Sequence, residues 1–287
     1  MTIRDATQQI SISVLDAELL LAYILQTSRT ALKAHPERTL TWSQLLRFFW
    51  YVHKRKNNVP LAYITGTKEF YGFEFEVNQH TLVPRPETEQ MVELAISHIM
   101  NNESQNILLI DIGTGSGCIP ISVAKTCRST NIQLGASDIS KKTIKIAKRN
   151  ANTLNADITF QTGNLLAPWI HEIAKEWSQL IITANLPYIT EEQWREEPSI
   201  KKEPKSALVA DESGLALYRE LLEQLQHILS PTLSVPITLY FEIDPDQTPR
   251  ITPLVETYFT HADTCIHADL SGLARIVEIH IDSPIPA

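Results

Sequence analysis

The fold is decided by the stretch DIGTGSGCI, residues 111–119, which directly follows the apolar run ILLI. Its three glycines suit a tight strand-to-helix turn in which backbone N–H groups can approach a ligand closely. A dinucleotide-binding fingerprint needs its third glycine three residues after the second, where this chain has Cys118, and no Walker lysine follows. The loop therefore indicates a ligand without a pyrophosphate, and a glycine-rich turn without any ligand is the plainer alternative.

Predicted strands and helices alternate around this loop. The alternation predicts an α/β fold with a parallel, doubly wound sheet whose ligand lies at the carboxyl ends of the strands. The last two strands follow each other without a helix, so we expect an antiparallel hairpin at one edge of the sheet. The predicted strands cover residues 106–113, 132–139, 158–163, 179–186, 237–243, 265–270 and 274–281, and the main helices begin near Ser116 and cover 140–154, 214–229 and 246–258.

The N-terminal third has a different pattern. Residues 13–57 carry apolar side chains at helical spacing, and residues 69–77 predict a β-hairpin turning near Gly72. The aromatic residues of the helical part are interpreted as core packing rather than as a docking face; they are Trp42, Phe48, Phe49 and Trp50. We expect a helical N-terminal domain over residues 1–66, a hairpin linker over 67–85 and an α/β catalytic domain over 86–287.

The composition excludes several function classes. The chain has 33 Asp and Glu against 25 Lys and Arg, so it has no overall electrostatic attraction to nucleic acid or anionic lipid. No secretory signal and no apolar run of roughly 18 residues is present, so we expect a cytoplasmic protein without membrane contact. The three cysteines and nine histidines show no ligand spacing, which predicts neither a disulfide framework nor a metal site.

Polar residues end the strands that follow the glycine loop. Asp138 stands where an acid commonly accepts hydrogen bonds from ribose hydroxyls; a helix cap is the alternative, although Ser140 can cap the same helix. A ribose-binding acid beside a loop that does not bind pyrophosphate suggests S-adenosylmethionine, whose methionine ammonium Asp111 would face. Asn164 is a candidate partner of the adenine amino group, and a plain turn explains it equally well.

The fourth strand ends in NLPY, residues 185–188, beside the first strand. The Asn185 side-chain oxygen and a backbone carbonyl can each accept one N–H of a planar NH2 group, which selects an amide or an exocyclic amine. Pro187 helps to hold the Leu186 carbonyl in place, and Tyr188 offers a flat face to a planar group. The segment predicts methyl transfer to a planar nitrogen, whereas a strand end with turn residues is the alternative.

These motifs together resemble the HemK/PrmC family of release factor glutamine N5-methyltransferases. The resemblance includes PLAYITGTKEFYGFEFEVN (residues 60–78), TLVPRPETE (81–89) and DLSGLARIV (269–277), and it covers nearly the whole chain. It implies a Rossmann-like class I methyltransferase fold preceded by a small helical domain that helps to dock a class I peptide chain release factor. It also implies methylation of the glutamine in the GGQ motif of that factor, with S-adenosyl-L-homocysteine as the cofactor product.

The resemblance also implies site residues. Cofactor contacts are implied at Gly113, Thr114, Gly115, Ser116, Gly117, Asp138, Leu165 and Asn185. The glutamine amide would be held by Asn185, Leu186, Pro187 and Tyr188, with Arg85 and Glu87 near the pocket, although a helix start explains the last two equally well. Two departures stand out: the family normally reads NPPY where this chain has Leu186, and it usually has an acid at the position of Asn164.

Two other functions fit parts of the sequence. NLPY also occurs in methyltransferases that act on the N6 amine of adenine in ribosomal RNA, but the acidic balance of the chain opposes nucleic acid as the direct substrate. A module that binds S-adenosylmethionine without turnover is the third possibility, motivated by Leu186 and Asn164.

Overall fold

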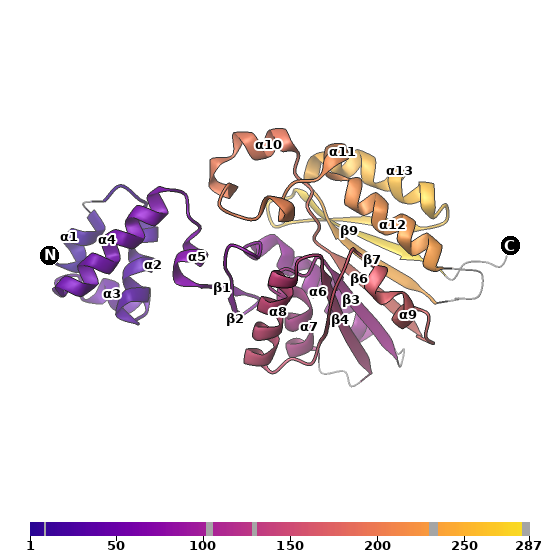
Figure 1. The fold of residues 1–287 in the computed structure, drawn as a ribbon, viewed down its shortest axis with the longest axis horizontal. Coiled ribbons are helices and arrows are strands. Elements are labelled where there is room, and N and C mark those ends of the chain that lie inside the picture. Colours follow the sequence, from indigo (N-terminus) through magenta and orange to yellow (C-terminus); the bar gives the residue numbers. More distant parts are fainter. Residues whose placement is uncertain (9, 102–105, 128–130, 230–234, 283–287) are drawn as a thin grey trace.

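The computed structural model describes residues 1–8, 10–101, 106–127, 131–229 and 235–282. A helical N-terminal lobe lies beside a larger α/β lobe, and the two are joined through α5 and the β1–β2 hairpin (Figure 1). Residues 283–287, the end of the expected catalytic domain, lie outside the described residues.

Several helices of the helical lobe begin at a side-chain cap. Ser13 accepts a hydrogen bond from the Asp16 N–H where α2 begins, and Thr41 and Gln44 form a capping box where α4 begins. Apolar residues of these helices, Phe48 among them, form a core of their own. The helices are α1 (Ile3–Gln8), α2 (Val14–Leu25), α3 (Arg29–Ala34), α4 (Trp42–Lys56) and α5 (Leu61–Thr65).

The outer face of α4 exposes large apolar side chains. Phe48 is fully buried as expected, but Trp42 is 76% exposed, Trp50 is 54% exposed and Phe49 is exposed as well, so the interpretation of these three as core residues was wrong. Trp42, Leu46, Phe49 and Trp50 lie at i, i+4, i+7 and i+8, which places them on one side of the helix, away from the core. We call these four residues the α4 stripe.

The predicted hairpin around Gly72 is present. β1 (Thr67–Phe70) and β2 (Phe73–Glu76) pair in antiparallel fashion, and their turn places Tyr71 and Gly72 at positive φ. Phe70 and Phe75 are buried in the core of the α/β lobe, so the hairpin packs on that lobe.

The predicted sheet is confirmed, with one addition. Its strand order is β5-β4-β3-β6-β7-β9-β8; the first five strands in this order are parallel, and β9 is antiparallel to both β7 and β8. The expected hairpin of the last two strands therefore forms, and its second strand lies inside the sheet. The strands are β3 (Ile107–Ile112), β4 (Ile132–Asp138), β5 (Thr159–Thr162), β6 (Gln179–Ala184), β7 (Ile237–Glu242), β8 (Asp263–Ala268) and β9 (Ala274–Ile281).

Helices cover both faces of this sheet (Figure 1). Alternate residues of β3 enter different cores: Leu109 packs with α6 and α7, and Leu108 packs with α12 and α13. One face carries α6 (Glu89–Asn101), α7 (Cys118–Thr126) and α8 (Lys141–Leu154), and the other carries α9 (Ile170–Ile173), α12 (Ala216–Ile228) and α13 (Thr248–Tyr258). The short helices α10 (Glu191–Glu196) and α11 (Asp211–Gly214) follow β6.

The order of the strands reverses at β3, which has β4 on one side and β6 on the other. The loops that leave β3 and β6 therefore diverge, and a crevice forms at the carboxyl ends of these strands. Among the described residues, no helix has the length and hydropathy that a membrane span requires.

Candidate active site

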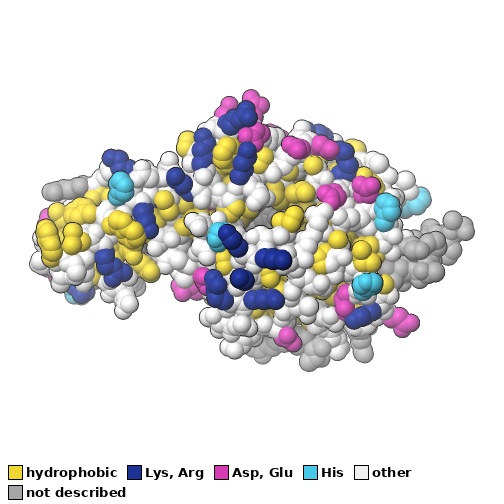
Figure 2. All heavy atoms as spheres, viewed as in Figure 1, with side chains coloured by type: hydrophobic (Ala, Val, Ile, Leu, Met, Phe, Trp, Pro, Cys, Tyr) yellow, Lys and Arg dark blue, Asp and Glu magenta, His cyan; other side chains and the backbone are white. Residues whose placement is uncertain are grey.

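A cavity of about 370 Å³ opens at the carboxyl ends of β3, β4 and β6. This volume is in the range of small-molecule sites. Figure 2 shows the α/β lobe hollowed beneath the α10 segment, with apolar side chains in the recess and Lys and Arg side chains of α8 below it. The sequence-predicted residues that line the cavity are Arg85, Gly113, Thr114, Gly115, Ser116, Asp138, Asn164, Leu165, Asn185, Leu186 and Pro187.

The glycine loop forms the inner wall of this cavity. Gly113, Gly115 and Gly117 all have positive φ, which only glycine adopts without strain. A Cβ on Gly113 would also lie 3.0 Å from the Leu186 side chain. The N–H groups of Gly113 and Thr114 donate to the Ser137 carbonyl, so these amides fix the loop to β4 instead of facing the cavity.

Asp111 is buried behind the loop and does not line the cavity. Its Oδ1 accepts a hydrogen bond from Thr183 Oγ1 at 2.8 Å, and its Oδ2 has no hydrogen-bond partner among the described residues. Burial raises the pKa of this carboxyl group from 3.8 to about 7. A carboxylate with one unpaired oxygen beneath a ligand cavity fits a ligand that carries a positive charge.

The raised pKa of Asp111 makes a signed prediction for stability. As the pH rises from 3.8 to about 7, the unfolded chain releases this proton while the folded chain keeps it, so this residue destabilises the fold progressively. The free energy of unfolding of Asp111→Asn, relative to that of wild type, should therefore increase as the pH rises over that interval. Above the interval, the difference between the two proteins should be constant. Urea unfolding at a series of pH values measures the difference, with exposed Asp157→Asn as the matched control. A difference independent of pH would contradict the burial argument.

Asp138 lies at the end of β4 on the cavity wall. Its Oδ2 accepts a hydrogen bond from the Gly115 N–H at 3.2 Å, and its Oδ1 accepts one from the Ser140 N–H at 2.8 Å. Ser140, not Asp138, is the N-cap of α8, because its hydroxyl accepts from the Thr143 N–H. Burial raises the pKa of Asp138, and the two backbone donors oppose this effect. The carboxylate is thus held beside the glycine loop instead of capping the helix.

Asn185 leaves the end of β6 with its carboxamide held by the segment before α6. Its Nδ2 donates to Thr88 Oγ1 at 3.1 Å. The oxygen and the nitrogen of a carboxamide point in different directions from the same carbon, so a hydrogen bond from Nδ2 to Thr88 turns Oδ1 away from Thr88. Neither Asn185 Oδ1 nor the Leu186 carbonyl accepts a hydrogen bond within the described part of the chain, so both acceptors are available to a ligand.

Four sequence-predicted residues do not line the cavity. Gly117 is the N-cap of α7, Asp111 is buried, and Glu87 is exposed. Tyr188 turns its hydroxyl toward the Glu242 carboxylate, to which it donates a hydrogen bond at 3.2 Å. Within the described residues, no group of three or more His, Cys, Asp or Glu side chains could hold a metal ion.

Sequence reasoning missed three residues of the site. Glu203 is buried; it accepts the Val83 N–H and pairs with Arg85 at 2.6 Å, which fixes the segment before α6 to the segment after α10. Thr88 and Glu242 lie behind Asn185 and are buried as well. A signal existed only for Glu242, as an acid that ends the apolar strand ITLYFE; the partners of Thr88 and Glu203 are too distant in sequence to be found by pattern.

Comparison with known proteins identifies the family. The PrmC N-terminal domain matches residues 4–66, and the methyltransferase small domain matches residues 86–193. A release factor glutamine methyltransferase of Bacillus anthracis is 35% identical over 268 residues, which is 92% of each chain. The chain belongs to the release factor glutamine methyltransferase family. A member from Enterococcus faecalis is 38% identical over 219 residues, covering 76% of this chain and 74% of that one.

A solved structure supports the methyltransferase fold. The hMettl16 catalytic domain, crystallised in complex with a 3′UTR hairpin, superposes with a TM-score of 0.52 at 15% identity and covers 86% of this chain and 85% of that one. At this identity the likeness shows the fold alone. With its methyltransferase small domain and its relatives, this member of the release factor glutamine methyltransferase family is an enzyme of the methyltransferase class.

Leu186 and Asn164, the two residues that depart from the family pattern, each make a hydrogen bond to α12. Leu186 has an N–H that proline lacks, and it donates to the Tyr218 hydroxyl at 3.3 Å; that hydroxyl in turn donates to the Glu242 carbonyl. The Leu186 side chain is buried against Gly113. Asn164 donates to the Glu220 carboxylate, so α12 brings an acid beside the position where the family usually has one.

Proposed function

We propose that this chain transfers the methyl group of S-adenosylmethionine to the side-chain N5 of the glutamine in the GGQ motif of a class I peptide chain release factor. The observation that carries the proposal is the Asn185 carboxamide on the cavity wall, oriented by Thr88 so that Oδ1 is left to accept an N–H group. Family membership supports the same substrate, because the relatives are named for glutamine methylation of release factors.

The residues around the cavity fit S-adenosylmethionine. Asp138 is held at the end of β4, where its carboxylate would accept hydrogen bonds from the ribose hydroxyls. Asn164 and Leu165 would lie against the adenine, and the unpaired Oδ2 of Asp111 would supply negative charge behind the methionine ammonium. When bound, the cofactor supplies a methyl group activated by a positively charged sulfur. S-adenosyl-L-homocysteine would leave from the same cavity.

The NLPY segment would hold the glutamine amide. Asn185 Oδ1 and the Leu186 carbonyl would each accept one N–H of the primary amide, which orients the nitrogen lone pair toward the methyl carbon. Such positioning can lower a barrier by about 7 to 11 kcal/mol. No strong base is needed, since the nitrogen can release a proton after it has become cationic. Pro187 lines the cavity and restricts the segment, and Arg85 lies at the same opening, paired with Glu203.

The helical lobe would dock the release factor. The α4 stripe exposes four large apolar side chains on one face of the lobe, and such contiguous patches commonly mark protein interaction sites. The stripe is therefore proposed as part of the surface that the protein substrate covers, while the cavity accepts its glutamine.

A labelling experiment tests the proposed function. The chain is incubated with methyl-labelled S-adenosylmethionine and a class I release factor, and mass spectrometry locates the label. We expect methylation of the GGQ glutamine, and no label in a release factor whose GGQ glutamine is replaced by alanine. Label on another residue, or none, would refute the proposal.

Ribosomal RNA is the second substrate included in this test. Exposed lysines of α8 gather beside the cavity opening in Figure 2. Their positive charge can attract the phosphates of RNA locally, although the net charge of the whole chain is negative. Label on adenine would establish the RNA methyltransferase. Binding of S-adenosylmethionine without label in either substrate would establish a binding module.

A further inference from the structure

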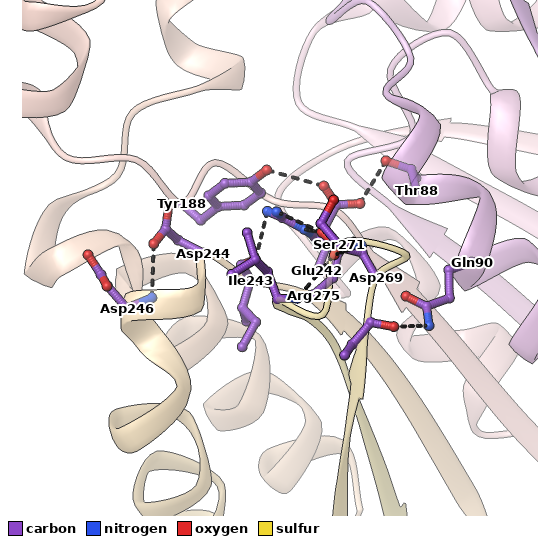
Figure 3. Close-up of polar contacts among 12 residues, drawn as sticks. Thr88, Gln90, Tyr188, Glu242, Ile243, Asp244, Asp246, Asp269, Ser271 and Arg275 are labelled. Atoms are coloured by element: carbon purple, nitrogen blue, oxygen red, sulfur yellow. Dashed lines mark hydrogen bonds and ion pairs between the residues drawn. The ribbon is translucent and has the colours of Figure 1, made fainter.

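A buried carboxylate lies behind the NLPY segment. Glu242 ends β7, is 1% exposed, and accepts two hydroxyl hydrogen bonds: Thr88 Oγ1 donates to its Oε2 at 2.7 Å, and the Tyr188 hydroxyl donates to its Oε1 at 3.2 Å (Figure 3). No Lys or Arg side chain pairs with it directly among the described residues, because Arg275 pairs with Asp269 and bonds the Ile243 carbonyl. Burying a charge without an ion-pair partner costs free energy, so a buried carboxylate at this position needs a structural or functional reason.

The direction of the Thr88 hydrogen bonds supplies that reason. An ionised carboxylate can only accept, so the single hydroxyl proton of Thr88 must point at Glu242. The lone pairs of Thr88 Oγ1 are then left to accept, and Asn185 Nδ2 donates to them at 3.1 Å. The opposite orientation of the carboxamide would place Asn185 Oδ1 against the Thr88 oxygen with no proton between them. The charge on Glu242 therefore determines which end of the Asn185 amide faces the cavity.

We propose that Glu242 is a positioning residue for methyl transfer, which acts through Thr88 to keep Asn185 Oδ1 facing the substrate nitrogen and through the Tyr188 hydroxyl to hold the end of the NLPY segment. The inference rests on the proposed function, in which Asn185 Oδ1 accepts an N–H of the substrate. Burial raises the pKa of Glu242, whereas the hydrogen bonds from the Thr88 and Tyr188 hydroxyls and the charge of Arg275 favour the ionised form on which the relay depends.

The substitution that tests the relay is Glu242→Gln. Glutamine keeps the size of the side chain but can donate a hydrogen bond to Thr88 Oγ1. The Thr88 hydroxyl can then donate to Asn185, which favours the opposite orientation of the Asn185 carboxamide, with Oδ1 facing Thr88. We expect kcat on the release factor to fall roughly 10-fold to 100-fold, as for other residues that orient a reacting group from behind. The affinity for S-adenosyl-L-homocysteine, measured by calorimetry, should stay at the wild-type value.

Matched variants separate the relay from a merely structural role. Thr88→Val removes the hydroxyl at nearly constant volume and should reproduce the loss in kcat, whereas Thr88→Ser keeps the hydroxyl and should restore most of it. Because Glu242 acts on Asn185 through Thr88, the double variant Glu242→Gln/Thr88→Val should lose no more activity than the worse single variant. Additive losses, or wild-type kcat in Glu242→Gln, would overturn the inference.

A measurement without turnover separates this inference from the proposed function. The side-chain amide NMR signals of Asn185, assigned by their loss in Asn185→Ala, report its hydrogen bond to Thr88 whatever the substrate is. We expect these signals to shift in Glu242→Gln and in Thr88→Val, and to stay near the wild-type position in Thr88→Ser. Unchanged signals in Glu242→Gln would overturn the relay even if the release factor is methylated, and absence of methylation by the wild type would refute only the proposed function.

Discussion

Asn185→Ala is expected to lose roughly a hundredfold or more in methyl transfer while it retains the wild-type affinity for S-adenosyl-L-homocysteine. The loss is comparable to removing one transition-state hydrogen-bond partner in other enzymes. The side chain contributes the acceptor Oδ1 on the cavity wall, and alanine leaves no group that could accept the substrate N–H there. Thr88 keeps its bond to Glu242 in the variant, so the surrounding structure should hold. Single-turnover rates on the release factor and calorimetry with the cofactor product measure the two quantities.

Asn152→Ala is the matched control for this prediction. It makes the same truncation at an exposed position of α8 that does not line the cavity, and its rate should equal that of wild type. A rate for Asn185→Ala within a few-fold of this control would remove Asn185 from the mechanism and would leave the backbone carbonyl of Leu186 as the sole proposed acceptor.

Gly214→Ala is expected to destabilise the chain by about 2 to 5 kcal/mol, a large part of the stability of an ordinary domain. Gly214 has φ +82, and a Cβ there would lie 1.8 Å from the Tyr188 carbonyl oxygen and 2.3 Å from Gln247 Nε2. That amide donates to the carbonyls of Tyr188 and Ser213, so the methyl group would separate the NLPY segment from α11 and from the start of α13. Chemical unfolding measures the loss, and methyl transfer should fall as Tyr188 moves.

Gly72→Ala separates the steric part of this effect from the conformational part. Gly72 has a similar φ of +74, but a Cβ there would meet nothing within 4 Å. Its substitution should cost only the left-handed backbone penalty, about 1 to 2 kcal/mol. If the two glycine variants are destabilised equally, the close approach of Gly214 to Tyr188 does not limit the structure.

The sheet could be predicted in detail because its signals are local. The buried strands are continuous apolar runs, the helices between them carry their caps in the sequence, and the loop at Gly113 can follow a strand only as a tight turn. The antiparallel pair at the end was predicted for the same reason. The insertion of β9 between β7 and β8 was not, because pairing with a distant strand leaves no mark on the residues of β9 themselves.

The site was predicted as far as chain neighbours determine it. Asn185, Leu186 and Pro187 belong to one short segment, and strand alternation places that segment beside the glycine loop. Asp111 and Tyr188 were predicted to face the ligands, but a sequence does not show whether a side chain at a strand end turns into a cavity or into the core. The structure turns both of them inward, where each has hydroxyl or carboxyl partners from other strands.

The sequence by itself determined the chain's architecture, the cavity at the carboxyl ends of the strands and the presence of Asn185 at its wall, because spacing along a strand and the conformational range of glycine act over a few residues. Only the tertiary structure decided which way the Asn185 amide faces. That orientation depends on Thr88, which lies 97 residues from Asn185, and on Glu242, which lies 154 residues from Thr88; the three meet only when the sheet is assembled. A hydrogen bond has a direction set by its partners, and these partners are selected by folding and not by proximity in sequence.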